Sequence, residues 1–309
     1  MWVIRITKTH AEVYSATRLS EDCDMENAGQ IVPRQGPQLF GDEIPRYWLG
    51  GDPFKTRFFE AMSLTFPDGE RYFIDCVRRY RDQVTDPELA AQVKAFMYQE
   101  GQHGMVHTQF NDRLRVQGIA VDKILAFARD KIEGFKRDFS PAFNLGKTAG
   151  AEHMTAMMAH GFFATGLLKD AHPRVRAMFA WHAVEEIEHK AVAFDVYQKV
   201  AKGGWLRRVL SMLHTSLSFS LHVLLITRYM LNVDGKGGWR TWLKGLWWLY
   251  GPGGLYLRLM PHYLAYFLPN FHPWKFGQLD TYKVWREAYD RSGGDMIAAA
   301  DATLKEVPT

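Results

Sequence analysis

The sequence reads WHAVEEIEHKAVAFDVY over residues 181–197, and this stretch contains a Glu-x-x-His motif that ends at His189. An earlier stretch, QEGQHGMVH over residues 99–107, contains the same motif, ending at His103. In a helix, a spacing of three places the carboxylate and the imidazole on one face, where they offer oxygen and nitrogen ligands to iron, manganese or zinc. Either motif alone is weak evidence, because glutamate and histidine also meet at this spacing by chance.

Helical periodicity surrounds both motifs and predicts an all-α protein. The expected helices span roughly residues 57–82, 85–117, 121–138, 141–169 and 172–202. We expect Pro67 to kink the first helix without ending it, and Thr85 to begin the second through a capping box with Glu88. No strand pattern competes over this region.

The register of these helices brings two further glutamates to the motifs. Antiparallel helices both rise about 1.5 Å per residue, so residues equally far from a turn lie at the same height. Glu100 lies fifteen residues after the expected turn at Thr85, and Glu70 lies fifteen residues before it. In the second hairpin, Glu152 and Glu186 are centred on residue 169. Each hairpin therefore offers a lone glutamate opposite a Glu-x-x-His motif.

These matched heights predict one shared site inside a four-helix bundle. The expected metal ligands are Glu70, Glu100, His103, Glu152, Glu186 and His189. Four carboxylates and two imidazoles suit a carboxylate-bridged dinuclear centre, and the carboxylates neutralise two divalent ions. Without cations, several buried glutamates in one core would be very costly. We therefore expect two divalent transition metals, with iron preferred and manganese or zinc as alternatives.

Three neighbours fall on the same helical faces, at about 100° per residue. His107 lies near the first motif, while His182 and Glu185 lie near the second. They are expected to support the ligands or to be ligands themselves, and Glu185 remains an alternative to Glu186. His153 and Glu188 point away and are expected on the surface or between helices, and Glu60 is expected to be structural.

Composition divides the chain into three expected parts. Residues 1–55, which are interrupted by many glycines and prolines, form an arm or loop, residues 56–203 form the bundle, and residues 204–309 form an aromatic-rich helical extension packed on it. The run 209–227 carries no charged side chain, and we favour a buried core helix there over an interfacial or membrane-spanning one. The last thirty residues suggest a polar helix and tail.

Charge and cysteine content limit the partners and the compartment. The net charge of +4 without a basic block gives no case for nucleic acid. Two cysteines and no recognisable signal peptide favour a reducing, cytoplasmic location. The exposed Trp and Leu expected in the extension would suit peripheral association with a membrane surface or a homodimer interface.

Four segments carry a resemblance to a known family: FFEAMSLTFPDGERYF (58–73), QEGQHGMVH (99–107), AEHMTA (151–156) and WHAVEEIEHKAVAFDVY (181–197). Over roughly residues 40–285 the chain resembles the bacterial predicted metal-dependent hydrolases, which group with ferritin-like di-metal proteins. The resemblance implies a ferritin-like bundle and assigns Glu70, Glu100, His103, Glu152 and His189 as ligands, with Glu186 or Glu185 completing the set.

Three functions remain open at this point. Our first hypothesis is a di-iron oxidase or oxygenase that uses O₂ on a hydrophobic or acyl substrate, in which Thr155 would hydrogen-bond the oxygen or simply pack between helices. The alternative is a metal-dependent hydrolase with a metal-activated water, for which His107 or Glu185 would act as the base. A third hypothesis is a non-catalytic metal-binding bundle.

Overall fold

The computed structural model describes residues 31–37, 44–275 and 280–305, and these segments contain helices but no strand. The prediction of an all-helical protein is therefore confirmed for the described residues. The largest part of the expected arm, residues 1–30, lies outside them.

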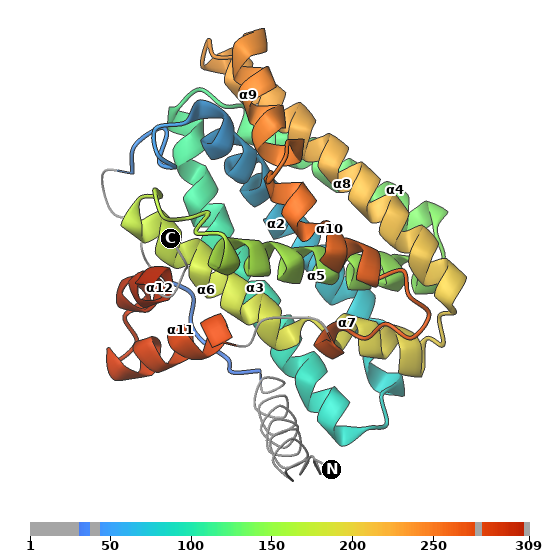
Figure 1. Ribbon diagram of the computed structural model, residues 1–309. Coiled ribbons are helices and arrows are strands. Elements are labelled where there is room, and N and C mark those ends of the chain that lie inside the picture. The colour runs from blue at the N-terminus through green and yellow to red at the C-terminus, as the bar shows by residue number, and fades with distance from the viewer. Residues whose placement is uncertain (1–30, 38–43, 276–279, 306–309) are drawn as a thin grey trace, which may run out of the picture.

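Four long helices form the centre of the molecule (Figure 1). They are α2 (Pro53–Arg78), α3 (Pro87–Val116), α5 (Pro141–Ala164) and α6 (Pro173–His189). Helix α2 packs along α3, and α5 packs along α6, while contacts of α2 with α5 and of α3 with α6 join the two pairs. Helix α4 (Val121–Asp138) connects the pairs and lies against α2. Helix α2 continues through Pro67, as expected.

An acidic or hydroxyl side chain followed by proline begins three of these helices. Asp52 accepts a hydrogen bond from the backbone N–H of Lys55 (3.0 Å), and Ser140 accepts one from that of Phe143 (3.2 Å). At α3 the cap is Asp86, which accepts from the N–H of Glu88 at 3.0 Å. The prediction that Thr85 caps this helix is therefore wrong by one residue, because the carboxylate of Asp86 takes the free N–H groups.

The fifth expected helix is interrupted. Helix α6 ends at His189 instead of continuing to residue 202, and the chain goes on through α7 (Val192–Asp195) and a π-helical turn, Val196–Val200. A π turn of this kind commonly accompanies functional sites, because it re-aims side chains without leaving the helix axis. Helix α5 is also shorter than expected and ends at Ala164, close to the positive-φ turn at Gly166.

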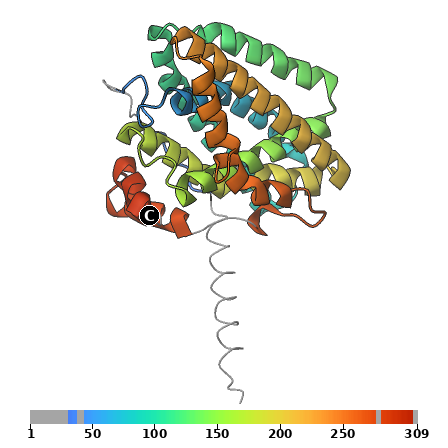
Figure 2. The ribbon, with the colours of Figure 1, turned by 45° about the horizontal axis from the view of Figure 1, so that its top comes forward.

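The C-terminal third packs against the bundle in two separate parts (Figures 1 and 2). It contains α8 (Trp205–Val233), α9 (Trp239–Tyr250), α10 (Leu255–Ala265), α11 (Asp280–Arg291) and α12 (Met296–Lys305). The expected polar helix and tail is in fact the pair α11 and α12, which packs on α6 and buries Trp285 completely. The expected domain boundaries near residues 55 and 203 remain predictions.

Helix α8 is held closely, but it is not the buried core helix that we expected. It approaches α5 at Gly146 and Gly150, where an added methyl group would meet Ser211 at 2.7 Å and Met212 at 3.2 Å. Its opposite face is open to solvent, and only 28% of its most apolar window is buried. By length and composition it is the one helix among the described residues that is able to cross a membrane. In contrast, α4 buries only Val121 and Ala128.

The cap of α3 gives a first prediction. Asp86→Ala is expected to lower the free energy of unfolding by about 1 kcal/mol, because two N–H groups lose their acceptor. Thr85→Ala is the matched control and should change it by less than about 0.5 kcal/mol, the usual range for surface substitutions. Urea unfolding followed by circular dichroism measures both, and equal losses in the two variants would contradict the assignment of the cap.

Candidate metal centre

Ten polar side chains from the four central helices meet in the core. Glu70 comes from α2, and α3, α5 and α6 contribute the others: Glu100, His103, His107, Glu152, Thr155, His182, Glu185, Glu186 and His189. Apart from Thr155, all of them are buried. The six expected metal ligands all belong to this group, so the structure brings them together as the register predicted.

The potential ligand atoms form overlapping clusters. Glu100, Glu152 and His189 form one group whose ligand atoms lie within 4.8 Å of one another, and Glu70, Glu100 and His103 form another. His189 Nε2 lies 3.3 Å from both Glu100 Oε1 and Glu152 Oε2. Glu100 belongs to both groups, and His182 belongs to two further groups, one with Glu70 and His107 and one with His103 and Glu186.

The geometry separates the roles of the adjacent Glu185 and Glu186. Glu186 reaches the centre, where its oxygens lie 2.8 Å from His182 Nε2 and 3.4 Å from His189 Nε2. Glu185 instead lies 3.1 Å from His103 Nε2, the nitrogen that faces away from the carboxylate cluster. This arrangement matches the usual carboxylate that orients a metal-binding histidine from behind.

A chain of hydrogen bonds connects Asn111 to His182. Asn111 donates from its amide nitrogen to the backbone oxygen of Ser63, so its carbonyl oxygen accepts the Ser63 hydroxyl proton at 2.7 Å. The Ser63 oxygen then accepts from His107 Nδ1 (2.8 Å), and His107 Nε2 accepts from His182 Nδ1 (2.6 Å). His182 Nε2 donates to Glu186 Oε1 at 2.8 Å. Burial opposes the charge of Glu186, yet His189 and this hydrogen bond hold its pKa well below the usual value.

The electrostatics of the cluster oppose several negative charges at once. Burial and the neighbouring carboxylates raise the pKa of Glu70 and of Glu100 well above the usual value. The pKa of Glu152 is raised to about 7 by the same causes, burial being the larger. His189 is buried, which opposes its charge, yet Glu186 and Glu152 raise its pKa to about 10. Without a metal, the four glutamates cannot all remain ionised.

The unpaired atoms point to the same conclusion. Both carboxylate oxygens of Glu70, Glu100 and Glu152 are buried without a hydrogen-bond partner, and so are His103 Nδ1 and His189 Nε2. Buried polar groups are almost always paired in native proteins, so this concentration of free acceptors is unusual. The donor set of oxygens and imidazole nitrogens fits divalent transition metals.

Two supporting residues were missed by the sequence reasoning. Gln99 accepts from His189 Nδ1 at 3.0 Å and donates to Glu188 at 2.9 Å. Arg34, in the segment expected to be a loop, pairs with Glu188 at 2.7 Å and lies 3.5 Å from Glu185. Gln99 directly precedes a predicted ligand, which was an available signal, whereas no periodicity connects Arg34 to the site.

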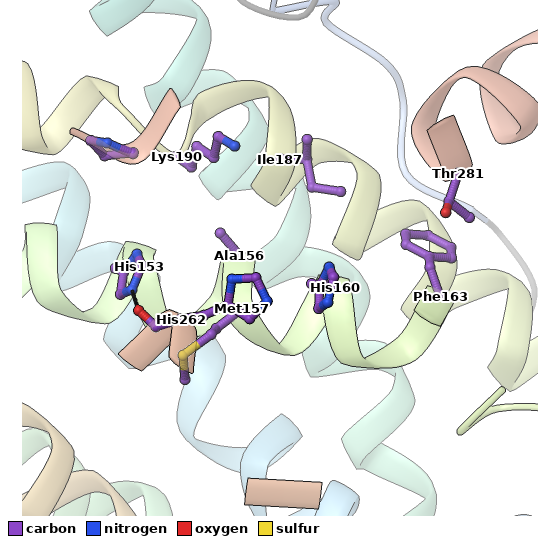
Figure 3. Close-up of a pocket in the computed structure, with 10 residues that line it drawn as sticks. His153, Ala156, Met157, His160, Phe163, Ile187, Lys190, His262 and Thr281 are labelled. Atoms are coloured by element: carbon purple, nitrogen blue, oxygen red, sulfur yellow. Dashed lines mark hydrogen bonds between the residues drawn. The ribbon is translucent and has the colours of Figure 1, made fainter. Parts of the chain in front are cut away.

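The three residues that we expected outside the site do lie outside it. Glu60 pairs with Arg57 at 2.6 Å and accepts from the Trp48 indole, so it is structural, as expected. Glu188 is buried between elements and is not on the surface. His153 lies between α5 and α10 and contacts the backbone oxygen of His262 at 2.9 Å, beside a small cavity of about 30 Å³ (Figure 3).

Comparison with known families decides between the functional alternatives. A family model described as predicted metal-dependent hydrolase matches residues 33–277. The chain belongs to this family. No curated protein and no solved structure matches it. Membership supports the alternative that we gave second, a hydrolase, and overturns our first hypothesis of an O₂-dependent di-iron oxidase. The ligand inventory misled us, because the same carboxylates and imidazoles suit oxygen chemistry and hydrolysis equally well.

We expect Glu100→Gln to lower the retention of metal without lowering the stability of the metal-free protein. Glu100→Gln removes a carboxylate from both ligand groups, so the protein should retain less than half of the wild-type ions after loading and dialysis, measured by atomic emission. The metal-free variant should unfold at the same temperature as metal-free wild type or a higher one, because it has one buried carboxylate fewer that needs a proton or a positive charge beside it. Glu133→Gln, on the exposed face of α4, is the control. Unchanged retention in Glu100→Gln would contradict the site.

Proposed function

We propose that the chain is a hydrolase that attacks an apolar small molecule with a metal-activated water. The main support for this proposal is that part of the polar cluster lines a cavity. Glu70, His182 and Glu186 line one wall of a cavity of about 430 Å³, which is otherwise mostly apolar. Cavities of this size hold small organic ligands, and their few polar groups orient the reacting part. Family membership supports the same class of reaction.

In this proposal the metal is held by the six residues expected from the sequence, in a helix arrangement like that of ferritin-like di-metal proteins. The bridging position of Glu100 supports two ions over one. When bound, divalent ions would lower the pKa of a water molecule and polarise the carbonyl or phosphoryl group under attack. Iron, manganese and zinc all fit these ligands, and without oxygen chemistry nothing in the donor set favours iron.

We assign His182 the role of proton acceptor. It lines the cavity, and its ring is held at Nε2 by Glu186 and at Nδ1 by the chain through His107 and Ser63. Nε2 and Glu186 Oε1 lie 2.8 Å apart and share a proton, and the carboxylate stabilises the charge when the imidazole carries a proton on both nitrogens. His107 holds the reactive tautomer from behind, in the way that a buried third group orients a catalytic base.

The bases expected from the sequence were His107 and Glu185, not His182, and Glu185 has a different environment. Its Oε1 accepts from the Trp181 indole at 3.0 Å, and Oε2 faces His103. It does not line the cavity wall described above. Burial raises its pKa to about 8, although Arg34 opposes the rise. We propose that Glu185 orients His103 and does not contact substrate, and that Thr155, which bonds Glu186, fixes that carboxylate.

The first test is turnover by metal-loaded protein. With zinc, manganese or ferrous ion under argon, the protein should hydrolyse p-nitrophenyl decanoate faster than p-nitrophenyl acetate, because the longer chain fills the apolar cavity. Dialysis against a chelator should abolish the activity, and adding the metal back should restore it. Protein that binds metal but cleaves no ester, phosphoester or amide in a substrate panel would instead favour a non-catalytic metal-binding bundle.

The second test separates the proposed base from the ligands. His182→Gln should lower kcat by about 100-fold or more, the usual contribution of a positioned base, while the metal content stays near that of wild type. Lost metal in His182→Gln would identify His182 as a ligand. Glu185→Gln should lower metal affinity by about 10-fold or more through His103, with a smaller effect on kcat of the loaded enzyme.

A further inference from the structure

The cavity beside the metal centre is elongated. Helices α4 and α8 form its rim, and two aromatic contacts mark the direction: Phe135 lies 5.3 Å from the His214 ring, and Phe127 lies 5.5 Å from the His222 ring. Phe127, Phe135 and His222 all line the cavity. Since eight helical residues separate the two phenylalanines, the cavity extends about 12 Å along α4.

Most of the cavity wall is apolar along this length. The apolar lining includes Met62, Phe66, Phe73, Met154, Met158 and Phe162. At one end, the partly exposed Phe127, Leu221 and Leu225 line it as well, which places an entrance there. A long, narrow apolar space favours an extended hydrocarbon chain over a compact polar molecule, because each buried methylene contributes about 0.8 kcal/mol.

The other end holds a buried lysine. Lys147 lines the cavity, is only 4% exposed, and its Nζ has no hydrogen-bond partner. Nζ lies 3.1 Å from the Phe135 ring centroid and 5.8 Å from that of Tyr72. A buried ammonium group without an acceptor is costly, so this nitrogen is a candidate for a pairing that a ligand supplies.

The groups that face Lys147 do not provide a counter-ion. Tyr72 and Cys76 approach it from α2 and His214 from α8, and none of these three is a carboxylate. Burial raises the pKa of both the Tyr72 phenol and the Cys76 thiol, so both are neutral near pH 7. Burial lowers the pKa of Lys147 to about 7. An anion at this point would favour the charged ammonium form.

We propose that the cavity binds an amphiphile whose anionic group pairs with Lys147 and whose hydrocarbon chain runs along α4 towards Phe127. The evidence for this binding site is the cavity and Lys147, and it does not depend on the proposed function. A second statement rests on the proposed function: the substrate is then an acyl compound with an anionic group, whose hydrolysable bond lies over Glu70 and Glu186.

Calorimetry on metal-free protein tests the binding without any turnover. Decanoate should bind at least tenfold more tightly than decanol at pH 6.5, and Lys147→Met should remove this difference. Above pH 7 the lysine loses its proton while decanoate remains ionised, so the affinity for decanoate should fall as pH rises. Equal affinities of wild type for the two ligands, or an unchanged preference in Lys147→Met, would overturn the pairing.

A second pair of variants tests the chain position independently of Lys147. Ala128 lines the cavity from α4, whereas Ala126 on the same helix is exposed and does not line it. Ala128→Phe should weaken binding of both decanoate and decanol at least tenfold, and Ala126→Phe should leave it unchanged. Circular dichroism checks that both remain folded. Full binding by folded Ala128→Phe would place the ligand elsewhere, whatever the result of the hydrolysis assays.

A different observation, the exposed face of α8 and α9, supports a separate inference. We define this apolar face by exposed side chains that recur at helical spacing on α8 and α9: Leu206, Leu210, Leu213, Leu217, Leu221, Leu225, Trp239, Leu243 and Trp247. Trp239 and Leu217 are 69% and 72% exposed. An exposed apolar patch of this extent marks an interaction surface.

The charged residues around the apolar face indicate what binds to it. Residues 205–265 contain seven lysines and arginines and a single acidic residue, Asp234. The Asp234 side chain is fully buried and pairs with Arg57 at 2.7 Å and with Arg46 at 2.9 Å, so it does not neutralise the surface. Six of the seven basic residues are exposed. In a two-fold dimer, the same cations would face each other, which disfavours self-association.

We propose that the apolar face docks on an anionic lipid bilayer, with tryptophan and leucine in the headgroup region and the cations on acidic lipid. Such a peripheral protein agrees with the proposed cytoplasmic location. Leu221 and Leu225 belong both to this face and to the cavity entrance, so an amphiphile would enter directly from the lipid.

Vesicle sedimentation tests the docking. The protein should sediment with vesicles of phosphatidylcholine and phosphatidylglycerol more than with phosphatidylcholine alone, and added salt should weaken the binding. Leu217→Ser with Trp239→Ser should reduce it at least tenfold, whereas Tyr98→Ser with Val116→Ser, exposed on α3, should not. A concentration-dependent dimer without vesicle binding, lost in the first double variant, would overturn this proposal in favour of a second copy of the chain.

Discussion

Charge balance in the core is the constraint on which the rest of the structure depends. Four glutamates are buried among the helices that form the centre of the molecule, and most of their oxygens have no partner in the protein. Burial and mutual repulsion raise the pKa of Glu70 and Glu100, so in the absence of metal the cluster must hold protons in place of cations. In contrast, the residues around the cluster are hydrogen-bonded to its histidines: Gln99 bonds to His189, and Ser63 bonds to His107.

The sequence was sufficient for the fold class and for the set of residues that meet, for a simple physical reason. Helical rise is constant, so equal distances from a turn translate into equal heights, and Glu70 meets Glu100 across the first hairpin. The choice between Glu185 and Glu186 was beyond this reasoning, because adjacent residues lie only about 100° apart on one helix face. Contact with Trp181 and Arg34 separates them, and those contacts depend on packing.

Other features left no local signal. Helix α6 stops at His189 without a glycine or proline to end it, so the π turn that follows was not foreseen. The charge-free run in α8 has the composition of a core helix, and its exposed side became visible only once its neighbours were placed. The reaction was the least accessible of all, since one ligand set serves both oxidation and hydrolysis, and family membership had to separate them.

The two walls of the cavity entrance differ in how firmly they are fixed. Helix α8 is locked onto α5, because Gly146 and Gly150 admit Ser211 and Met212 at near contact and leave no room for sliding. Helix α4 has just two buried residues, Val121 and Ala128, and so has little apolar area to lose on moving. The entrance therefore has one closely packed wall, α8, and one wall, α4, with little buried apolar area to hold it in place. The entrance and the metal centre are built from different helices on this side, because α4 contributes none of the ten polar side chains in the core.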